Sequence, residues 1–124
     1  MSKYHNQVTI TSDGIKHASQ KEATRWCELK LLERAGKIAD LRRQVEYELI
    51  PAQYETYERF SKRGEKLGDG MRVAERRVVY VADFVYIDEN GQEIVEDTKG
   101  VRTKEYIIKR KLMRYMWGIA ITEI

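Results

Sequence analysis

The sequence predicts a mixed α/β fold in which a helix is followed by three strands, a second helix and a last strand. Apolar residues recur at helical spacing over 19–35 and 103–117. The segments between and after these helices have the pattern of strands instead. They either alternate apolar and polar residues or are apolar on both faces. The chain has 124 residues, which suits one domain with one core. We therefore expect a single mixed sheet flanked by helices.

The first helix is expected from Ser19 to about Ala35, with Gly36 where a C-terminal glycine cap belongs. Glu22 stands three residues after Ser19, which is the spacing of a capping box, and its carboxylate could bond the backbone of its own helix end. Glu22 also borders the apolar stripe and could face the sheet instead. The sequence leaves both interpretations open.

Three strands and a helix follow. Residues 41–49 alternate, and Pro51 ends that strand. Residues 51–73 are polar and contain glycine, which predicts a long mobile or functional loop that begins with a short helical turn. A central strand over 76–87, a shorter strand over 93–99, a helix capped by Thr103 and a last strand over 118–124 complete the domain. We expect residues 1–15 to form a flexible N-terminal arm and 16–124 to form the domain.

Composition excludes several classes of protein. With 42% hydrophobic and 35% charged residues the chain reads as globular, and it has neither an apolar run of the roughly 18 residues that span a membrane nor the apolar core of a signal peptide. We therefore expect a cytoplasmic protein without a membrane partner. One cysteine and two histidines provide neither an internal disulfide nor a zinc site. Any metal would have to be held by carboxylates, which favours Mg²⁺ or Mn²⁺.

The stretch "VADFVYIDENGQEIVEDTKG" places Asp83, Asp97 and Lys99 on two neighbouring strands. A two-residue Asn90-Gly91 turn would put the two aspartates on opposite faces. A three-residue loop with Gly91 in a left-handed bulge would instead place Asp83 opposite Asp97. We favour the bulged loop, because an unpaired aspartate buried on a sheet is costly and two aspartates can share a divalent cation.

Two carboxylates and a lysine at one position of a sheet suit metal-assisted hydrolysis of a phosphodiester. The carboxylates would hold Mg²⁺, which stabilises charge on the attacked phosphate, and the ammonium would position or activate the water. Asp97 and Lys99 could also be a simple ion pair on an exposed strand. Glu96 could be the ligand if the register slips by one residue.

This pattern resembles the PD-(D/E)XK nuclease superfamily, which has an Asp on the second core strand and Asp/Glu-X-Lys on the third. The stretch from Tyr80 to Gly100, with "RTKEYIIKRKLM", is similar to a small phage and prophage group of endonuclease-like proteins in that superfamily. The resemblance covers about Lys16 to Ile124 and implies a restriction-endonuclease-like core. The sequence departs from the namesake motif in having Ala82 in place of Pro and Asp97 where Glu is commoner.

The resemblance assigns a role to each matched residue. It makes Asp83 the first metal ligand, Asp97 the second acidic ligand and Lys99 the motif lysine. Glu22 matches the glutamate often found on the first helix, which would make it a further metal ligand. All four would be catalytic residues.

Basic residues could contact nucleic-acid phosphates, although charge alone favours a solvated surface as their explanation. Gln44 lies on the polar face of the first strand and could border the site. The candidate phosphate contacts are Arg42, Lys62, Arg63, Lys104, Lys109 and Lys111.

We therefore expect a Mg²⁺- or Mn²⁺-dependent DNA endonuclease. The small size suggests that it selects branched, flap or Holliday-junction DNA, in phage recombination or replication inside a bacterial host cell. Branched DNA has local symmetry, so a homodimer would suit it. The alternatives are a non-catalytic nucleic-acid-binding protein and a phage accessory protein that binds another protein.

Overall fold

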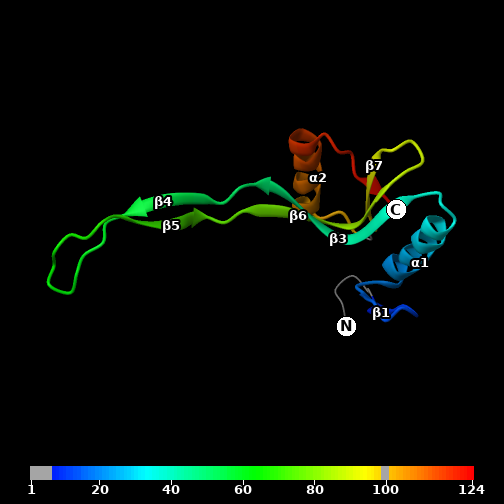
Figure 1. Ribbon diagram of the computed structural model, residues 1–124, viewed down its shortest axis with the longest axis horizontal. Helices are drawn as coiled ribbons and strands as arrows, with labels where there is room; N and C mark the ends of the chain where they lie inside the picture. The colour runs from blue at the N-terminus through cyan, green and yellow to red at the C-terminus, as the bar shows by residue number, and fades with distance from the viewer. Residues whose placement is uncertain (1–6, 99–100) are drawn as a thin grey trace.

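A mixed four-stranded sheet forms the centre of the computed structural model, which describes residues 7–98 and 101–124 (Figure 1). The strands lie in the order β3 (Ala39–Ile50), β6 (Val78–Ile87), β7 (Glu93–Asp97) and β8 (Thr122–Glu123). β3 pairs with β6 and β6 pairs with β7 in antiparallel fashion, and β8 runs parallel to β7. Helix α1 (Gln20–Arg34) precedes β3, and α2 (Lys104–Trp117) lies between β7 and β8. The predicted fold class and the order of these six elements are confirmed.

The two helices cover opposite faces of the sheet, and each face has its own apolar cluster. The α1 cluster consists of Trp26, Leu29, Phe84 and Tyr86. The α2 cluster consists of Tyr47, Leu49, Tyr80, Ala82, Val85, Val95, Tyr106 and Met113. Strand β6 contributes to both clusters, because its successive side chains point to opposite faces. This explains why its sequence is apolar on both faces.

Both helices begin at the predicted caps. The Ser19 hydroxyl accepts a hydrogen bond from the Glu22 backbone N–H at 3.1 Å, and the Thr103 hydroxyl accepts one from the Tyr106 N–H at 3.1 Å. Helix α2 ends at Gly118, whose φ of 66° is left-handed. The caps therefore fix the position of the first turn of α1, which carries Glu22.

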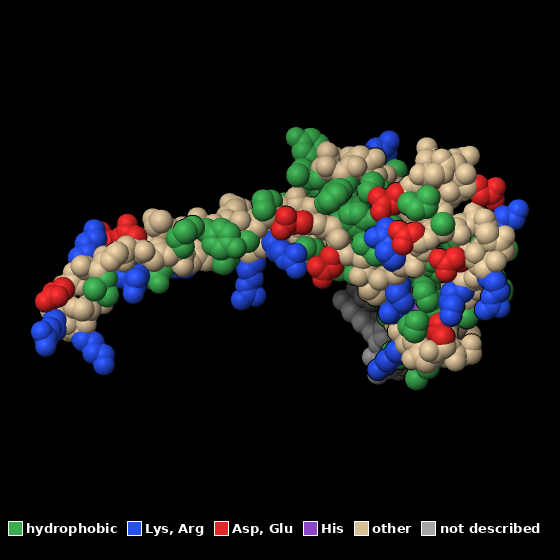
Figure 2. Space-filling model, in the orientation of Figure 1, with side chains coloured by type: hydrophobic (Ala, Val, Ile, Leu, Met, Phe, Trp, Pro, Cys, Tyr) green, Lys and Arg blue, Asp and Glu red, His purple; other side chains and the backbone are tan. Residues whose placement is uncertain are grey.

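The prediction of an irregular loop over 51–73 is wrong. Strands β4 (Gln53–Tyr57) and β5 (Gly70–Glu75) form an antiparallel two-stranded sheet, which we call the ribbon, with a tip at residues 58–69. The ribbon projects away from the body of the molecule as an extension of β3 and β6 (Figures 1 and 2). The predicted helical turn is absent from it. The polar composition misled the prediction, because every strand residue here except Gly70 is exposed, so no apolar face had to be buried.

Part of the predicted N-terminal arm forms a two-stranded sheet with the residues that follow it. Residues 1–6 of the predicted arm lie outside the described residues, but β1 (Thr9–Ile10) pairs with β2 (Lys16–His17) and so gives part of that arm a regular structure. Asp13, in the connection between them, accepts hydrogen bonds from Trp26 at 2.7 Å and from Lys30 at 2.9 Å. These bonds hold the segment against α1. Neither helix in the described part of the chain is long and apolar enough to cross a membrane.

Replacing Leu29 with Ala should lower the free energy of unfolding by about 2–5 kcal/mol, because Leu29 is fully buried beneath α1 and its loss leaves a cavity. Leu31→Ala is the matched control, because Leu31 lies on the same helix with 63% of its surface exposed, and it should cost about 0.5 kcal/mol or less. Urea unfolding followed by circular dichroism measures both. Equal losses would contradict the packing of α1 described above.

Candidate functional site

The turn between β6 and β7 has the predicted three-residue form. The Asp88 N–H donates to the Gln92 carbonyl at 2.9 Å, and the Gly91 N–H donates to the Asp88 carbonyl at 3.0 Å. Gly91 has a left-handed φ of 77°. In every pair from Ile87↔Glu93 to Phe84↔Glu96, the two residue numbers add up to the same even value. A two-residue turn would give an odd value instead. The bulged turn is confirmed, and the register that it sets is observed as far as Phe84↔Glu96, one residue before Asp83 and Asp97.

Asp83 lies where the alternation of burial along β6 changes phase. Ala82 belongs to the α2 cluster and Phe84, two residues later, belongs to the α1 cluster, although residues two apart normally share a face. Across the strand pair, Gln44 lies between residues paired with Ala82 and Phe84, and its φ is 53°. A left-handed non-glycine residue is uncommon and is frequent at functional sites. The strand pair is therefore distorted at Gln44 and Asp83.

Glu22 is buried, with only 4% of its surface exposed, and points away from its own helix. Its Oε1 accepts a hydrogen bond from Gln44 Nε2 at 3.2 Å and lies 3.5 Å from His17 Nδ1. Burial, and then the charge of Asp83, raise the pKa of the Glu22 carboxyl. Ser19 caps the helix through the Glu22 backbone, so the Glu22 side chain is left to face the sheet.

Asp83 is half-buried and is held by Thr98. Its Oδ2 accepts hydrogen bonds from the Thr98 backbone N–H and from the Thr98 hydroxyl, both at 2.8 Å. Within the described part of the chain neither Asp83 nor Glu22 forms an ion pair with a lysine or arginine. We call Glu22 and Asp83 the acidic pair. It is a position where negative charge is concentrated.

Asp97 faces a different set of partners. Its Oδ2 accepts a hydrogen bond from the Tyr80 hydroxyl at 2.5 Å, on the face of the α2 cluster. Asp97 and Asp83 therefore have different hydrogen-bond partners, and their convergence on one cation stays a prediction; no group of three His, Cys, Asp or Glu side chains that could hold a metal ion is found in the described ranges. The alternation of strand faces shifts at Asp83, and the two carboxylates have different partners: Asp83 is bonded to Thr98 and Asp97 to Tyr80. Lys99 lies outside the described residues.

Glu96 belongs to a buried ionic network. Arg25 donates to both of its carboxylate oxygens at 2.7 Å, and the Tyr86 hydroxyl donates to Oε2. The hydrogen bond to Glu96 contributes most to raising the pKa of Arg25. The register does not slip, so the alternative in which Glu96 replaces Asp97 is not supported. This carboxylate stabilises the contact between α1 and β7.

The candidate phosphate contacts do not form one surface. Lys62 and Arg63 are exposed at the tip of the ribbon, and Lys104 and Lys111 are exposed on α2. Two more candidates are engaged in ion pairs. Arg42 is 3.3 Å from Glu93, and Lys109 is 3.1 Å from Glu105.

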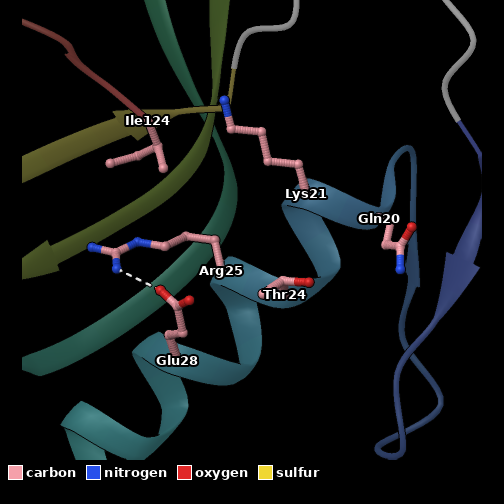
Figure 3. Close-up of a pocket in the computed structure, with 6 residues that line it drawn as sticks. All are labelled: Gln20, Lys21, Thr24, Arg25, Glu28 and Ile124. Carbon is pink, nitrogen blue, oxygen red and sulfur yellow. Dashed lines mark hydrogen bonds and ion pairs between the residues drawn. The ribbon is translucent and has the colours of Figure 1, made fainter.

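A shallow pocket of about 350 Å³ lies beside α1 (Figure 3). Its lining residues are Gln20, Lys21, Thr24, Arg25, Glu28 and Ile124. Arg25 is already bonded to Glu28 at 2.9 Å and to Glu96. Lys21 projects from the first turn of α1 in the direction of the sheet (Figure 3). The acidic pair does not line this pocket, so we do not treat it as the site.

Sequence reasoning missed two residues of the site. In the sequence His17 is only one of two histidines that are too few for a zinc site, yet it is 1% exposed and lies against Glu22. The sequence does hold one indication that His17 lies near Glu22. His17 stands two residues before the helix cap Ser19, and a residue there lies close to the first turn of the helix. Thr98 lies between Asp97 and Lys99 in the motif, and no pattern indicated that it would bind Asp83.

The fold and the acidic pair define a mixed α/β protein with a polar site between its first helix and the central strands. A family model with the description "Protein of unknown function (DUF1064)" matches residues 1–121, so the chain belongs to the DUF1064 family. Searches of curated proteins and of solved structures gave no match.

Replacing Glu22 with Gln should raise the melting temperature at neutral pH. The pKa of Glu22 is higher in the folded chain than in the unfolded chain, so the folded state binds more protons between these two values and stability falls as pH rises through them. The advantage of the variant should disappear near and below the unfolded pKa of 4.5, where both states are protonated.

The measurement is thermal unfolding from about pH 4 to about pH 8 in EDTA. Glu89→Gln is the control, because Glu89 is exposed in the turn between β6 and β7 and should show no such trend. A Glu22→Gln variant that is less stable than the wild type at neutral pH would contradict the electrostatic strain described for the acidic pair.

Proposed function

We propose that this protein is a metal-dependent deoxyribonuclease that hydrolyses DNA phosphodiester bonds. The observation that carries the proposal is the acidic pair: Glu22 is buried beside Asp83, and its pKa is raised by burial and by that charge. Concentrated carboxylate charge is costly where, as among the described residues here, no lysine or arginine pairs with it, and such strain is typical of functional sites. The order of elements and the resemblance to PD-(D/E)XK nucleases support the same conclusion.

The acidic pair fits Mg²⁺ or Mn²⁺. Mg²⁺ is commonly bound by one or two carboxylates together with water and substrate phosphates, so Glu22 and Asp83 are sufficient donors. When bound, the metal would stabilise negative charge on the attacked phosphate and lower the pKa of a bound water. Asp97, whose Oδ2 accepts a hydrogen bond from the Tyr80 hydroxyl, would be a further ligand, as the resemblance implies.

The surrounding residues orient the two carboxylates. Thr98 fixes Asp83 through two hydrogen bonds, and Gln44 fixes Glu22 through one. Such partners hold ligands in one orientation and so reduce the cost of binding a metal. Lys99, which follows Thr98 directly in the sequence, would position the attacking water, as the resemblance implies.

DNA is the proposed substrate, with branched, flap or Holliday-junction structures preferred. The exposed cations at the ribbon tip and on α2 suit phosphates rather than base edges. The setting would be phage recombination or replication in the cytoplasm of a bacterial host, and a homodimer would match the symmetry of a junction.

Asp83→Asn and Lys99→Ala should each reduce cleavage of labelled junction or flap DNA by about 100-fold or more in Mg²⁺ or Mn²⁺, because each removes charge that acts on the reacting phosphate. Wild-type protein should lose activity in EDTA. Gel assays on junction, flap, linear duplex and single-stranded DNA measure the rates and identify the preferred structure.

Glu89→Gln and Lys37→Ala are the matched controls, because both residues are exposed and belong neither to the acidic pair nor to the ribbon tip. They should cleave at the wild-type rate. If wild-type protein cuts none of these DNAs with either metal, the nuclease proposal is wrong.

One observation favours a second candidate, a nucleic-acid-binding or phage accessory protein without catalysis. Asp97 is bonded to Tyr80, and the described residues include no group of three metal ligands. A site with this arrangement could persist after losing activity. Salt-sensitive DNA binding without cleavage would identify the first of these proteins, and binding to another protein would identify the second.

Neutralising Lys62 and Arg63 together should weaken DNA binding uniformly across sequences. The logarithm of affinity falls with the logarithm of salt concentration, and each lost phosphate contact makes this slope shallower by about 0.9. The slope of the double alanine variant should therefore be shallower by up to about 2. Arg34→Ala with Lys37→Ala, at the exposed end of α1, is the control of equal charge. An unchanged slope would show that the ribbon tip does not contact phosphates.

A further inference from the structure

Arg42 and Arg43 are neighbours in the sequence, but they lie on opposite faces of the sheet. Arg42 pairs with Val85, which belongs to the α2 cluster, and Arg43 pairs with Phe84, which belongs to the α1 cluster. Directly paired residues share a face, so Arg43 lies on the face that α1 covers. Glu22 faces the sheet from that helix. Arg43 and this member of the acidic pair are therefore on the same side of the sheet.

Arg43 borders the acidic pair on three elements. On β3 it directly precedes Gln44, whose amide is bonded to the Glu22 carboxylate. Its Nη2 donates to the Lys16 carbonyl on β2 at 3.3 Å, and the next residue, His17, lies against the same carboxylate. On β6, the other acid of the pair comes directly before the residue that pairs with Arg43. A phosphate bound at the acidic pair would therefore have this guanidinium as a neighbour.

Among the described residues, Arg43 is half-buried and forms no ion pair. Arg25 and Arg110 are also half-buried, and they pair with Glu96 at 2.7 Å and with Glu123 at 3.2 Å. Every Asp and Glu of the chain lies in the described ranges, so each was available to pair with Arg43. A partly buried cation without an anion is costly, and an anionic ligand would remove this cost.

The guanidinium of Arg43 is also short of hydrogen-bond acceptors. Its Nε is buried and donates to no described residue, and its bond to Lys16 goes to a backbone carbonyl. Arg25, by contrast, donates to both carboxylate oxygens of Glu96 at 2.7 Å. A guanidinium has several N–H donors in a planar fork. Arg43 therefore keeps donors for a further partner.

We propose that Arg43 binds a backbone phosphate of DNA beside the acidic pair, an inference that rests on the proposed function for the identity of the ligand. The guanidinium fork matches two phosphate oxygens, and the phosphate supplies the missing negative charge. The acidic pair repels that phosphate, and a cation next to it offsets the repulsion. Arg42, the candidate from the sequence, lies on the other face and is within 3.5 Å of both Asp40 and Glu93.

Fluorescence anisotropy with labelled junction and duplex DNA in EDTA tests this inference without cleavage. Arg43→Met keeps an apolar stem and removes the charge, so affinity should fall by about 10-fold. The slope of log affinity against log salt should become shallower by about 0.9. Arg43→Lys should restore the slope but only part of the affinity, because an ammonium lacks the fork. Arg34→Met, exposed at the end of α1, is the control and should bind as the wild type does.

Unchanged affinity in Arg43→Met, or a loss that only Arg42→Met shows, would overturn the proposal. Wild-type protein that binds none of these DNAs would overturn it as well. If the wild type binds DNA through Arg43 but cuts none, this inference stands and the nuclease proposal is wrong. If the wild type cuts DNA and Arg43→Met binds and cuts equally well, the nuclease proposal stands and this inference is wrong.

Nuclear magnetic resonance separates phosphate binding from a structural role. The buried Nε–H of Arg43 should give a ¹H–¹⁵N signal, which is assigned by its absence from Arg43→Lys. This signal should shift when a short DNA duplex is added in EDTA. The Nε–H of Arg25, which is bonded to Glu96, is the internal reference and should not shift. No shift at Arg43, or equal shifts at both arginines, would overturn the proposal.

Discussion

The pairing of β3 with β6 is the interaction on which the rest of the structure depends. These two strands give side chains to both apolar clusters, so each helix packs on a surface that the pair provides. The same pair carries Gln44 and Asp83 in the body, and its continuation forms the ribbon (Figure 1). A change in this register would turn apolar side chains to solvent and would also move the site. The fold, the acidic pair and the projecting ribbon are therefore consequences of one ladder of hydrogen bonds.

The buried carboxylates fall into two groups, and the difference between them is the main argument for function. Glu96 is neutralised by Arg25, and Asp97 is bonded to Tyr80, so both have partners typical of a stable interior. Glu22 has an amide and a neighbouring histidine but also the repulsive charge of Asp83. A chain selected only for stability would not keep two carboxylates in this arrangement. A divalent cation would remove the repulsion, and this is why we connect the pair to metal-dependent chemistry.

Much of the core was predictable from sequence, because periodicity and caps are local signals. The first helix, the bulged turn at Gly91 and the central strand all followed from such signals. The ribbon did not, since an exposed hairpin has no buried face to create a pattern. The site was predicted in part: Glu22 and Asp83 lie together, but the partner of Asp97 depends on Tyr80, a contact between strands that spacing alone does not encode. The distortion at Gln44 is likewise a tertiary effect, because nothing in the sequence around Gln44 indicates a left-handed residue.

We propose above all that Glu22 and Asp83 together bind a divalent cation. Titration of Mn²⁺ followed by electron paramagnetic resonance tests it directly, because the signal of the free ion is lost on binding and no DNA is needed. Our account predicts saturable binding to the wild type that is lost in Asp83→Asn and weakened in Glu22→Gln, with Asp69→Asn unchanged. Wild-type protein that leaves the Mn²⁺ signal unaffected, or binding that survives both substitutions in the acidic pair, would contradict the account.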